Sequence, residues 1–172
     1  MPFTAFHIVA GASVKSVCPK YFSWSIFTLT NIVIDTEVLY YFFTTGEFSH
    51  KLFHTIIGAS IIAILCASLG KPICELGLRI WNNNLQNEKS MERLRWLNTG
   101  VKINTVPSLI GAFTGAYTHL ILDSVMHADI VPLAPFTNLN NLLGIISIES
   151  LQYICLGSFV IGLVIYLVRK FV

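Results

Sequence analysis

The sequence predicts an all-α membrane protein: a polytopic helical bundle of about four transmembrane helices, preceded by a helix that enters half of the membrane. Apolar residues make up 54% of the 172-residue chain and charged residues only 12%. Four apolar stretches are long enough to cross a hydrocarbon core of about 30 Å. We expect residues 1–172 to form a single integral-membrane helical domain.

The first expected element is a short apolar helix over residues 5–18, AFHIVAGASVKSVC. It is too short to cross a bilayer alone, and no basic residue precedes it as in a secretory signal. We expect it to start in the outer half of the membrane, to descend to Lys15 and Lys20, and to turn at Pro19. His7 would then be buried.

The four expected crossings follow in order. They cover residues 24–43, 53–70, 105–127 and 145–168. The first contains Asp35 and Glu37, and an even number of crossings places both termini on one side. Between the second and third crossings, residues 71–104 alternate apolar and charged side chains, which is typical of a pair of helices lying at the membrane interface.

The basic residues indicate an orientation. Lys51 alone would lie on one side of the membrane, and the other side would carry Lys15, Lys20, Lys71, Arg79, Lys89, Arg93, Arg95, Lys102, Arg169 and Lys170. The positive-inside rule therefore places the termini and residues 71–104 in the cytoplasm. The same rule accounts for the net charge of +2, so the charge indicates no nucleic-acid partner.

Histidine and aspartate recur at helical spacing. His119, Asp123 and His127 form H-x3-D-x3-H in THLILDSVMH, and His50 and His54 form H-x3-H in HKLFHT. Residues four apart share one face of a helix. We therefore expect each set to project from one helix face, as metal ligands do.

A depth estimate brings residues from four segments to one level. With a rise of about 1.5 Å per residue, His7, Asp35, His54 and His119 all lie roughly 20–24 Å from the cytoplasmic edge. His50, Glu37, Asp123 and His127 lie up to two turns nearer the outer surface. A lone membrane histidine usually bonds to another helix, but so many ionisable groups at matched depth favour a metal site. The candidate ligands are His7, Asp35, His50, His54, His119, Asp123 and His127.

The ligand set suits zinc best, with manganese, iron or nickel as alternatives, since it offers imidazole and carboxylate but no thiolate. It exceeds the three protein ligands of a single catalytic zinc, and about 12 Å would separate His119 from His127 along a helix. We therefore expect two ions bridged by Asp123. Such a pair can bind a phosphoryl or acyl oxygen and activate water. Glu37, or else Asp35 or Asp123, could serve as the general base.

Glycines extend the faces that carry these ligands. Gly111 and Gly115 precede His119 at steps of four, and Gly58 follows His54 at the same step. Small residues at this spacing let membrane helices approach closely. We expect the ligand-bearing helices to pack backbone against backbone beneath the site.

Four segments resemble a family of bacterial integral-membrane proteins identified as membrane-bound metal-dependent hydrolases, most of them uncharacterised. They are MPFTAFH, NIVIDTE, HKLFHT and HLILDSVMHADIVPLAPF. The family pattern is an early His, Asp-x-Asp, H-x3-H-[ST] and a later H-x3-D. This chain matches it with His7, Asp35, His50, His54, Thr55, His119 and Asp123. Glu37 stands where many relatives have the second Asp, so its oxygens would be placed differently.

A weaker, local resemblance links the H-x3-D to zinc-dependent phospholipase C. Together the resemblances imply a phosphoesterase-like hydrolase in the bacterial inner membrane, with its site facing outward and a lipid or lipid-linked substrate. The outer loop, residues 128–141, would border the entrance with Asn138, Asn140 and Asn141. With Lys51 the only outward cation, phosphate recognition would depend on the metals.

Other functions remain open at this point. A metal transporter would need a polar path to the cytoplasm, whereas inner helix halves such as IIAILCASL are apolar. A haem protein could use His54 and His119 as axial ligands, although clustered carboxylates fit haem iron poorly. A purely structural protein would give no reason to bury Asp35 and Asp123.

Overall fold

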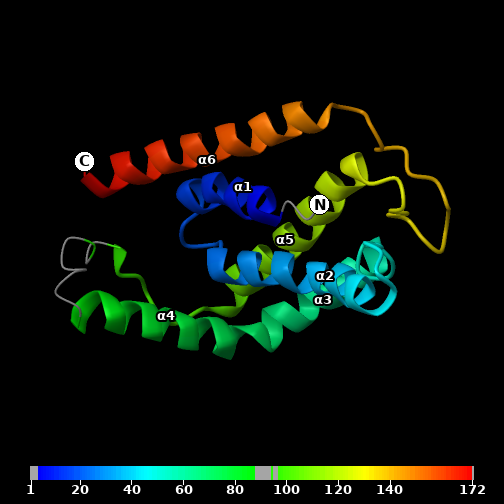
Figure 1. Ribbon diagram of the computed structural model, residues 1–172. Helices are drawn as coiled ribbons and strands as arrows, with labels where there is room; N and C mark the ends of the chain where they lie inside the picture. The colour runs from blue at the N-terminus through cyan, green and yellow to red at the C-terminus, as the bar shows by residue number, and fades with distance from the viewer. Residues whose placement is uncertain (1–3, 88–93, 95–96, 172) are drawn as a thin grey trace.

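The computed structural model describes residues 4–87, 94 and 97–171, and within them it contains helices and connections but no strand (Figure 1). The elements are α1 (Thr4–Val17), α2 (Trp24–Thr45), α3 (Ile56–Ser68), α4 (Gly70–Asn87), α5 (Thr105–Met126) and α6 (Ile148–Phe171). The all-helical prediction is confirmed.

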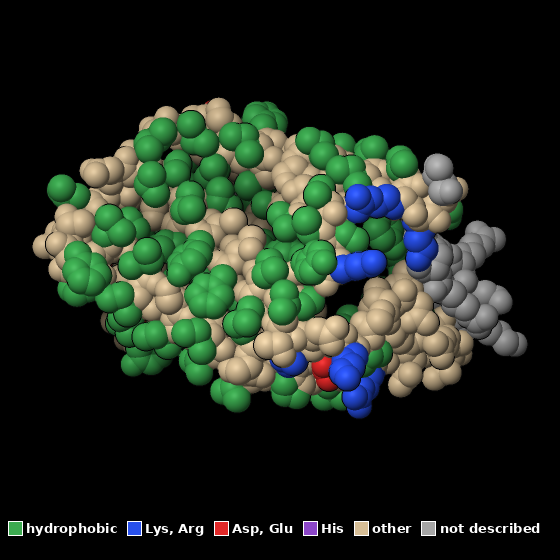
Figure 2. All heavy atoms as spheres, turned by 180° about the vertical axis from the view of Figure 1, so that it is seen from behind, with side chains coloured by type: hydrophobic (Ala, Val, Ile, Leu, Met, Phe, Trp, Pro, Cys, Tyr) green, Lys and Arg blue, Asp and Glu red, His purple; other side chains and the backbone are tan. Residues whose placement is uncertain are grey.

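The helices α2, α5 and α6 are each long and apolar enough to cross a membrane. A fourth candidate crossing consists of α3 and α4 together, which meet at an angle of 53°. Large apolar side chains are exposed on several of these helices, including Ile32, Phe43, Ile61, Val160 and Val164. Figure 2 shows hydrophobic side chains spread over one face, as lipid contact requires. The chain is a helical membrane bundle of three or four crossings.

The second expected crossing, residues 53–70, is wrong as a single straight helix. It is replaced by α3, which has only 13 residues, and by the bend at Leu69 that leads into α4. Gly70 and Pro72 follow the bend, and proline has no N–H to continue the hydrogen bonds of α3. Of the interfacial pair expected in residues 71–104, α4 is one helix; the other falls largely on residues 88–93 and 95–96, outside the described part.

Helix α5 lies in the centre, packed against α2 and α3, and its glycines set the closest approach to α2. A Cβ atom added at Gly111 would overlap the carbonyl oxygen of Ser23, and one at Gly115 would lie 2.9 Å from the carbonyl oxygen of Phe27. This confirms the expected backbone-to-backbone packing of the ligand-bearing helices. Gly58 differs, because its close neighbour is the carbonyl oxygen of Leu52, in the loop before its own helix.

The short helix α1 runs beside α6 (Figure 1), and small polar residues join the two. The hydroxyl groups of Ser13 and Ser158 are 2.7 Å apart, and Ser16 donates a hydrogen bond to the carbonyl oxygen of Gly162 at 2.6 Å. An apolar helix at the N-terminus was expected over residues 5–18 and is found over Thr4–Val17. This packing fixes the helix that carries His7.

Candidate metal centre

Four ionisable side chains from three parts of the chain meet inside the bundle. Asp35 comes from α2, His54 from the loop before α3, and His119 and Asp123 from α5. One ligand atom from each lies within 4.8 Å of the others. His54 and His119 are fully buried, while the side chain of Asp35 is 13% exposed. We call these four residues the buried cluster.

The distances within the buried cluster match those of a metal coordination shell. His119 Nε2 lies 3.0 Å from Asp123 Oδ2 and 3.2 Å from Asp35 Oδ1. His54 Nε2 lies 3.5 Å and 3.9 Å from the same two oxygens. Ligand atoms about 2.0–2.1 Å from a tetrahedral zinc ion are roughly 3.3 Å apart. The four His–Asp separations, and the limit of 4.8 Å that holds for every pair, are therefore compatible with one shared ion.

The ring nitrogens that face this point make no hydrogen bond to any described residue, although carboxylate oxygens are near. This holds for Nε2 of His54, of His119 and of His7. A hydrogen bond requires alignment as well as proximity, and burying an unpaired polar atom is costly. A cation between His54 and His119 would bind the Nε2 atoms of both rings at once.

His7 lies at the edge of the buried cluster. Its Nε2 atom is 3.3 Å from Asp123 Oδ1, the carboxylate oxygen that faces away from His54 and His119. Its ring centroid is 4.5 Å from that of His119, and the side chain is 2% exposed. The structure thus brings the four residues of equal expected depth, from α1, α2, α5 and the loop before α3, into one place.

Asn31 sets the direction of the His119 ring. Its amide oxygen lies 3.0 Å from His119 Nδ1, and its amide nitrogen donates to the carbonyl oxygen of Phe27 at 2.8 Å. Since the amide nitrogen is already used, the oxygen can only accept a proton from Nδ1. The hydrogen of the neutral ring is then on Nδ1, and the lone pair of Nε2 faces the carboxylates, as in many metal-bound histidines. Sequence reasoning missed Asn31, although it precedes Asp35 by one helical turn.

Glu37 performs the same task for His54. Its Oε2 atom lies 3.2 Å from His54 Nδ1. It also accepts hydrogen bonds from the backbone N–H groups of Lys51 at 3.1 Å and Phe53 at 3.0 Å. The carboxylate therefore fixes both the His54 ring and the loop that carries it. Carboxylates that hold a ligating histidine in this way are common around metal ions.

A second group lies at the end of α5 and is more exposed. His50, His127 and Asp129 place one ligand atom each within 4.8 Å of one another. Asp129 Oδ2 is 2.9 Å from His50 Nδ1 and also accepts the backbone N–H of His50 at 2.9 Å. The ring centroids of His50 and His127 are 4.4 Å apart, and His50 is 4.6 Å from His54. We call these three residues the rim cluster.

The chain was compared with known protein families, curated proteins and solved structures. The model of one family, described as a domain of unknown function (DUF4184), matches residues 1–171. The chain belongs to the DUF4184 family. No curated protein and no solved structure matches the DUF4184 chain. Both clusters lie within the matched residues, and the family description assigns them no role.

The DUF4184 chain differs from the expected helical sets in two places. His50 and His54 do not share a helix face, because α3 begins only at Ile56, with the Thr55 side chain accepting the N–H of Gly58. The Glu37 carboxylate accepts the N–H groups of Lys51 and Phe53, so these backbone groups are bonded without a helix. His127 follows the last residue of α5, Met126, in an extended conformation with φ −117° and ψ 122°. Of the expected set His119, Asp123 and His127, only the first two therefore lie within the helix.

The sequence analysis also missed Asp129, which joins His50 and His127 in the DUF4184 chain. Burial raises the pKa of the Asp129 carboxyl, but the hydrogen bonds from the His50 backbone and ring outweigh it, and the net shift is downward. Burial lowers the pKa of His127. Both side chains thus favour the forms that bind cations, an ionised carboxylate and a neutral imidazole.

The loop expected to border the entrance is tied to the same end of α5. Asn140 donates to the carbonyl oxygens of Ser124 at 2.8 Å and His127 at 3.5 Å, and Asn138 and Asn141 are exposed. Of the three asparagines in this loop, Asn140 therefore holds the loop in place. The exposed pair remains on its surface.

Proposed function

We propose that the DUF4184 protein is a membrane-embedded, metal-dependent hydrolase that acts like a phosphoesterase on a lipid or lipid-linked substrate at the outer half of a bacterial inner membrane. One observation carries the proposal. Three buried histidine nitrogens, on His7, His54 and His119, face two aspartates without making a hydrogen bond within the described chain. The three atoms lie 3.0–3.5 Å from carboxylate oxygens without the alignment of a hydrogen bond, an arrangement that suits a shared cation.

The donor set of the buried cluster suits zinc first and manganese or iron second, because it consists of imidazole and carboxylate groups. His54, His119 and Asp123 would hold the ion, Asp35 would lie beside its fourth position, where water would bind, and His7 would support it through Asp123. A bound ion of this kind polarises a phosphoryl or carbonyl oxygen and makes water a stronger nucleophile.

The three carboxylates near the ion have different surroundings. Glu37 is occupied by two backbone N–H groups and His54, which suits a positioning residue. Asp123 contacts His7, His54 and His119, which suits a ligand. Asp35 has the most exposed side chain of the three, at 13%. We assign to Asp35 the acceptance of a proton from attacking water, with Glu37 as the earlier alternative.

The rim cluster would hold a second ion. His50 links the two groups, because its ring lies 4.6 Å from His54 and 4.4 Å from His127. Asp129 supplies a carboxylate to the rim in addition to the expected bridge, Asp123. Two ions at one site bind both the attacked group and the leaving oxygen.

The alternatives fit the geometry less well. A transporter needs ligands continuing towards the other face, but the next turns of α5 place Ala112, Ala116 and the glycines in the apolar core. A haem between His54 and His119 would collide with the Asp35 and Asp123 oxygens, which lie within 3.9 Å of the two Nε2 atoms. These contacts favour a bare ion.

The distribution of charge supports the proposed orientation. Figure 2 shows Lys and Arg side chains gathered at one end of the molecule, where Lys15 ends α1 and Arg169 and Lys170 end α6. The positive-inside rule assigns that end to the cytoplasm. The two clusters would then lie towards the outer surface, accessible to lipid-linked substrates of the outer leaflet.

The test is elemental mass spectrometry on protein purified in mild detergent, followed by assays on phospholipids and polyprenyl phosphates. We expect near-stoichiometric zinc, manganese or iron in the parent and its loss in His119→Ala and Asp123→Ala. Glu149→Gln, an exposed acid in the first turn of α6, is the matched control and should keep its metal. Asp35→Asn should reduce turnover more than metal content. A metal-free parent with well-folded variants would falsify the proposal.

A further inference from the structure

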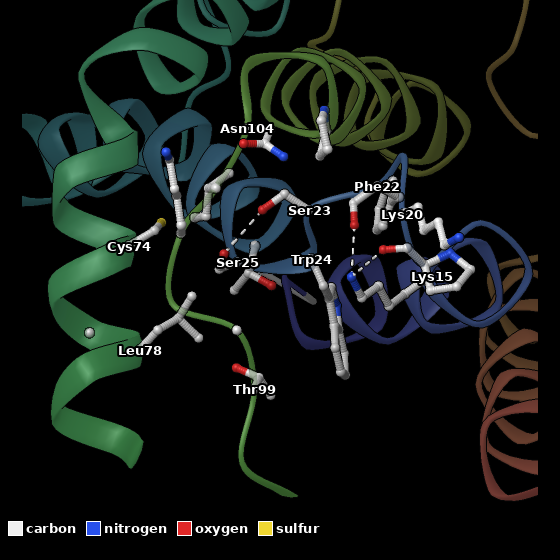
Figure 3. A pocket seen from close by; sticks show the side chains of 17 residues that line it. Lys15, Lys20, Phe22, Ser23, Trp24, Ser25, Cys74, Leu78, Thr99 and Asn104 are labelled. Atoms are coloured by element: carbon white, nitrogen blue, oxygen red, sulfur yellow. Dashed lines mark hydrogen bonds between the residues drawn. The ribbon is translucent and has the colours of Figure 1, made fainter. Parts of the chain in front are cut away.

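A cavity of about 750 Å³ opens between α4, the turn from α1 to α2 and residues 99–104 (Figure 3). None of the residues that line it belongs to the buried cluster or the rim cluster. The cavity is therefore a separate feature, which the proposed hydrolase activity does not use.

The charged residues of this cavity are all basic. Lys15, Lys20 and Lys102 line it, and among the described residues the lining includes no Asp or Glu side chain. Lys15 is held in place, because its ammonium group donates to the carbonyl oxygens of Pro19 at 2.9 Å and Phe22 at 3.0 Å. Lys20 and Lys102 are exposed at the rim. One carboxylate lies next to the lining, because Glu75 accepts the backbone N–H of the lining residue Ile103 at 2.9 Å. The three ammonium groups outnumber it and create a net positive potential that attracts an anion.

The polar wall adds hydrogen-bonding groups to this charge. Ser23, Ser25 and Asn104 line the cavity, and Figure 3 shows them close together at its inner end. Ser23 caps α2 and Asn104 precedes α5, so two helices begin beside the cavity. The helix dipoles thus reinforce the attraction that the lysines supply.

Part of the lining is apolar, which distinguishes this cavity from a site for a small inorganic anion. Trp24 and Leu78 line it, and Leu78 belongs to the face of α4 that also presents Gly77. On the neighbouring face of α4, Ile73, Leu76 and Ile80 are exposed. At the basic end of a membrane protein, an apolar helix face is expected at the boundary between the lipid headgroups and the acyl chains.

We propose that this cavity binds the headgroup phosphate of an anionic phospholipid, whose glycerol and upper acyl chains lie along Trp24 and Leu78. Basic pockets between helices on the cytoplasmic side commonly bind such headgroups. The apolar lining residues favour a lipid over a free phosphate ion, because acyl chains can pack against them and a phosphate ion cannot. The proposal is independent of the metal site.

Two pairs of variants test the charge and the space separately. Lys20→Gln with Lys102→Gln removes two lining charges, and Lys71→Gln with Arg79→Gln removes two charges of α4 that do not line the cavity. Gly77→Leu inserts a side chain where a Cβ meets no atom within 4 Å, so the helix tolerates it while the cavity loses volume. Gly157→Leu on α6 is the matched control, since its Cβ is equally unhindered.

The measurement is native mass spectrometry of the full chain after equilibration with equal amounts of phosphatidylglycerol and phosphatidylcholine. We expect selective retention of phosphatidylglycerol by the parent and by both controls. The double lysine variant and Gly77→Leu should each retain at least about fivefold less. Equal retention of the two lipids, or equal loss in a test variant and its control, overturns the proposal.

A second arm separates a lipid from a free anion. The midpoint of thermal unfolding is recorded in lipid-free detergent while inorganic phosphate or dioleoyl phosphatidylglycerol is added. We expect the lipid to raise the midpoint of the parent but not of Gly77→Leu, and phosphate at the same concentration to leave both unchanged. Stabilisation by phosphate equal to that by the lipid would assign the cavity to a free anion instead.

Discussion

The amide oxygen of Asn31 lies 3.0 Å from Nδ1 of His119, and this contact directs the other ring nitrogen towards Asp35 and Asp123. Asn31 is fully buried and anchored to its own helix through the Phe27 carbonyl oxygen. Asn31 contacts the buried cluster through His119, so we expect it to affect a bound ion through that ring.

Asn31→Ala should therefore weaken metal binding without removing a ligand. The expected loss of affinity is about 10–100-fold, the range typical of residues that orient a ligating histidine. Competition with a chromogenic chelator measures it. Asn31→Asp keeps an acceptor for Nδ1 and should lose less, while Asn138→Ala on the exposed loop should lose nothing. Equal affinities of Asn31→Ala and Asn138→Ala would remove Asn31 from the site.

Glu37→Ala should destabilise the loop that carries His54. It leaves the N–H groups of Lys51 and Phe53 without their acceptor. An unsatisfied buried group costs about 1–3 kcal/mol, so we expect the free energy of unfolding to fall by an amount in this range. Denaturation in mixed micelles measures the change.

Glu37→Gln separates positioning from proton transfer at the same residue. It retains one acceptor oxygen but cannot take up a proton from water. If Glu37 only positions His54, this variant keeps most of its metal and its turnover. Normal metal content with turnover lost by a hundredfold or more would instead identify Glu37 as the base.

Gly115→Ala should disturb the site through the backbone. The added Cβ would lie 2.9 Å from the Phe27 carbonyl oxygen and 3.2 Å from Asn31 Nδ2. Helix α5 must then move away from α2, and the Asn31–His119 contact moves with it. We expect a loss of about 1–3 kcal/mol of stability together with weaker metal binding. Gly157→Ala is the control, and an equal effect there would point to a general loss of helix flexibility.

Asp129→Ala and His127→Ala should separate the two clusters. Both residues belong to the rim cluster, and neither is among the four residues of the buried cluster. We expect elemental analysis to show a ratio near two metals per chain in the parent and near one in each variant. A drop to zero would mean that the rim residues are needed for the buried ion as well.

Removal of metal should lower the thermal stability of the parent. An ion that binds only the folded state at one hundred times its dissociation constant adds about 2.7 kcal/mol. Extensive dialysis against a chelator should therefore lower the unfolding midpoint, and zinc should restore it. His119→Ala should show neither change. A parent insensitive to both treatments would contradict a structural contribution by the metal.

The regular parts of this fold could be predicted from hydropathy. The helices α2, α5 and α6 occupy three of the four apolar stretches, and α1 lies within one residue of its expected range. The bend at Leu69 could not be predicted from composition, because the apolar stretch continues through it. Only the Gly70 and Pro72 that follow it carry a local signal.

The site was less predictable than the helices because part of it lies on loops. Matched depth identified His7, Asp35, His54 and His119, and these lie together in the structure. Regular spacing misassigned HKLFHT to a helix, because the N–H groups of Lys51 and Phe53 donate hydrogen bonds to Glu37, which is distant in sequence, and these bonds shape the loop. Asp129 contacts His50, which lies in the same loop. The two residues are far apart in the sequence, and no local sequence pattern predicts their contact.

Helix α6 supplies no ligand, yet it holds α1 through Ser158 and Gly162, and α1 carries His7. A premature stop codon between Leu151 and Ser158 would leave every ligand codon intact while removing this support. In a genetic screen such an allele would resemble a ligand mutation in its phenotype. Helix α6 is in this sense part of the candidate metal site, although none of its described residues belongs to either cluster.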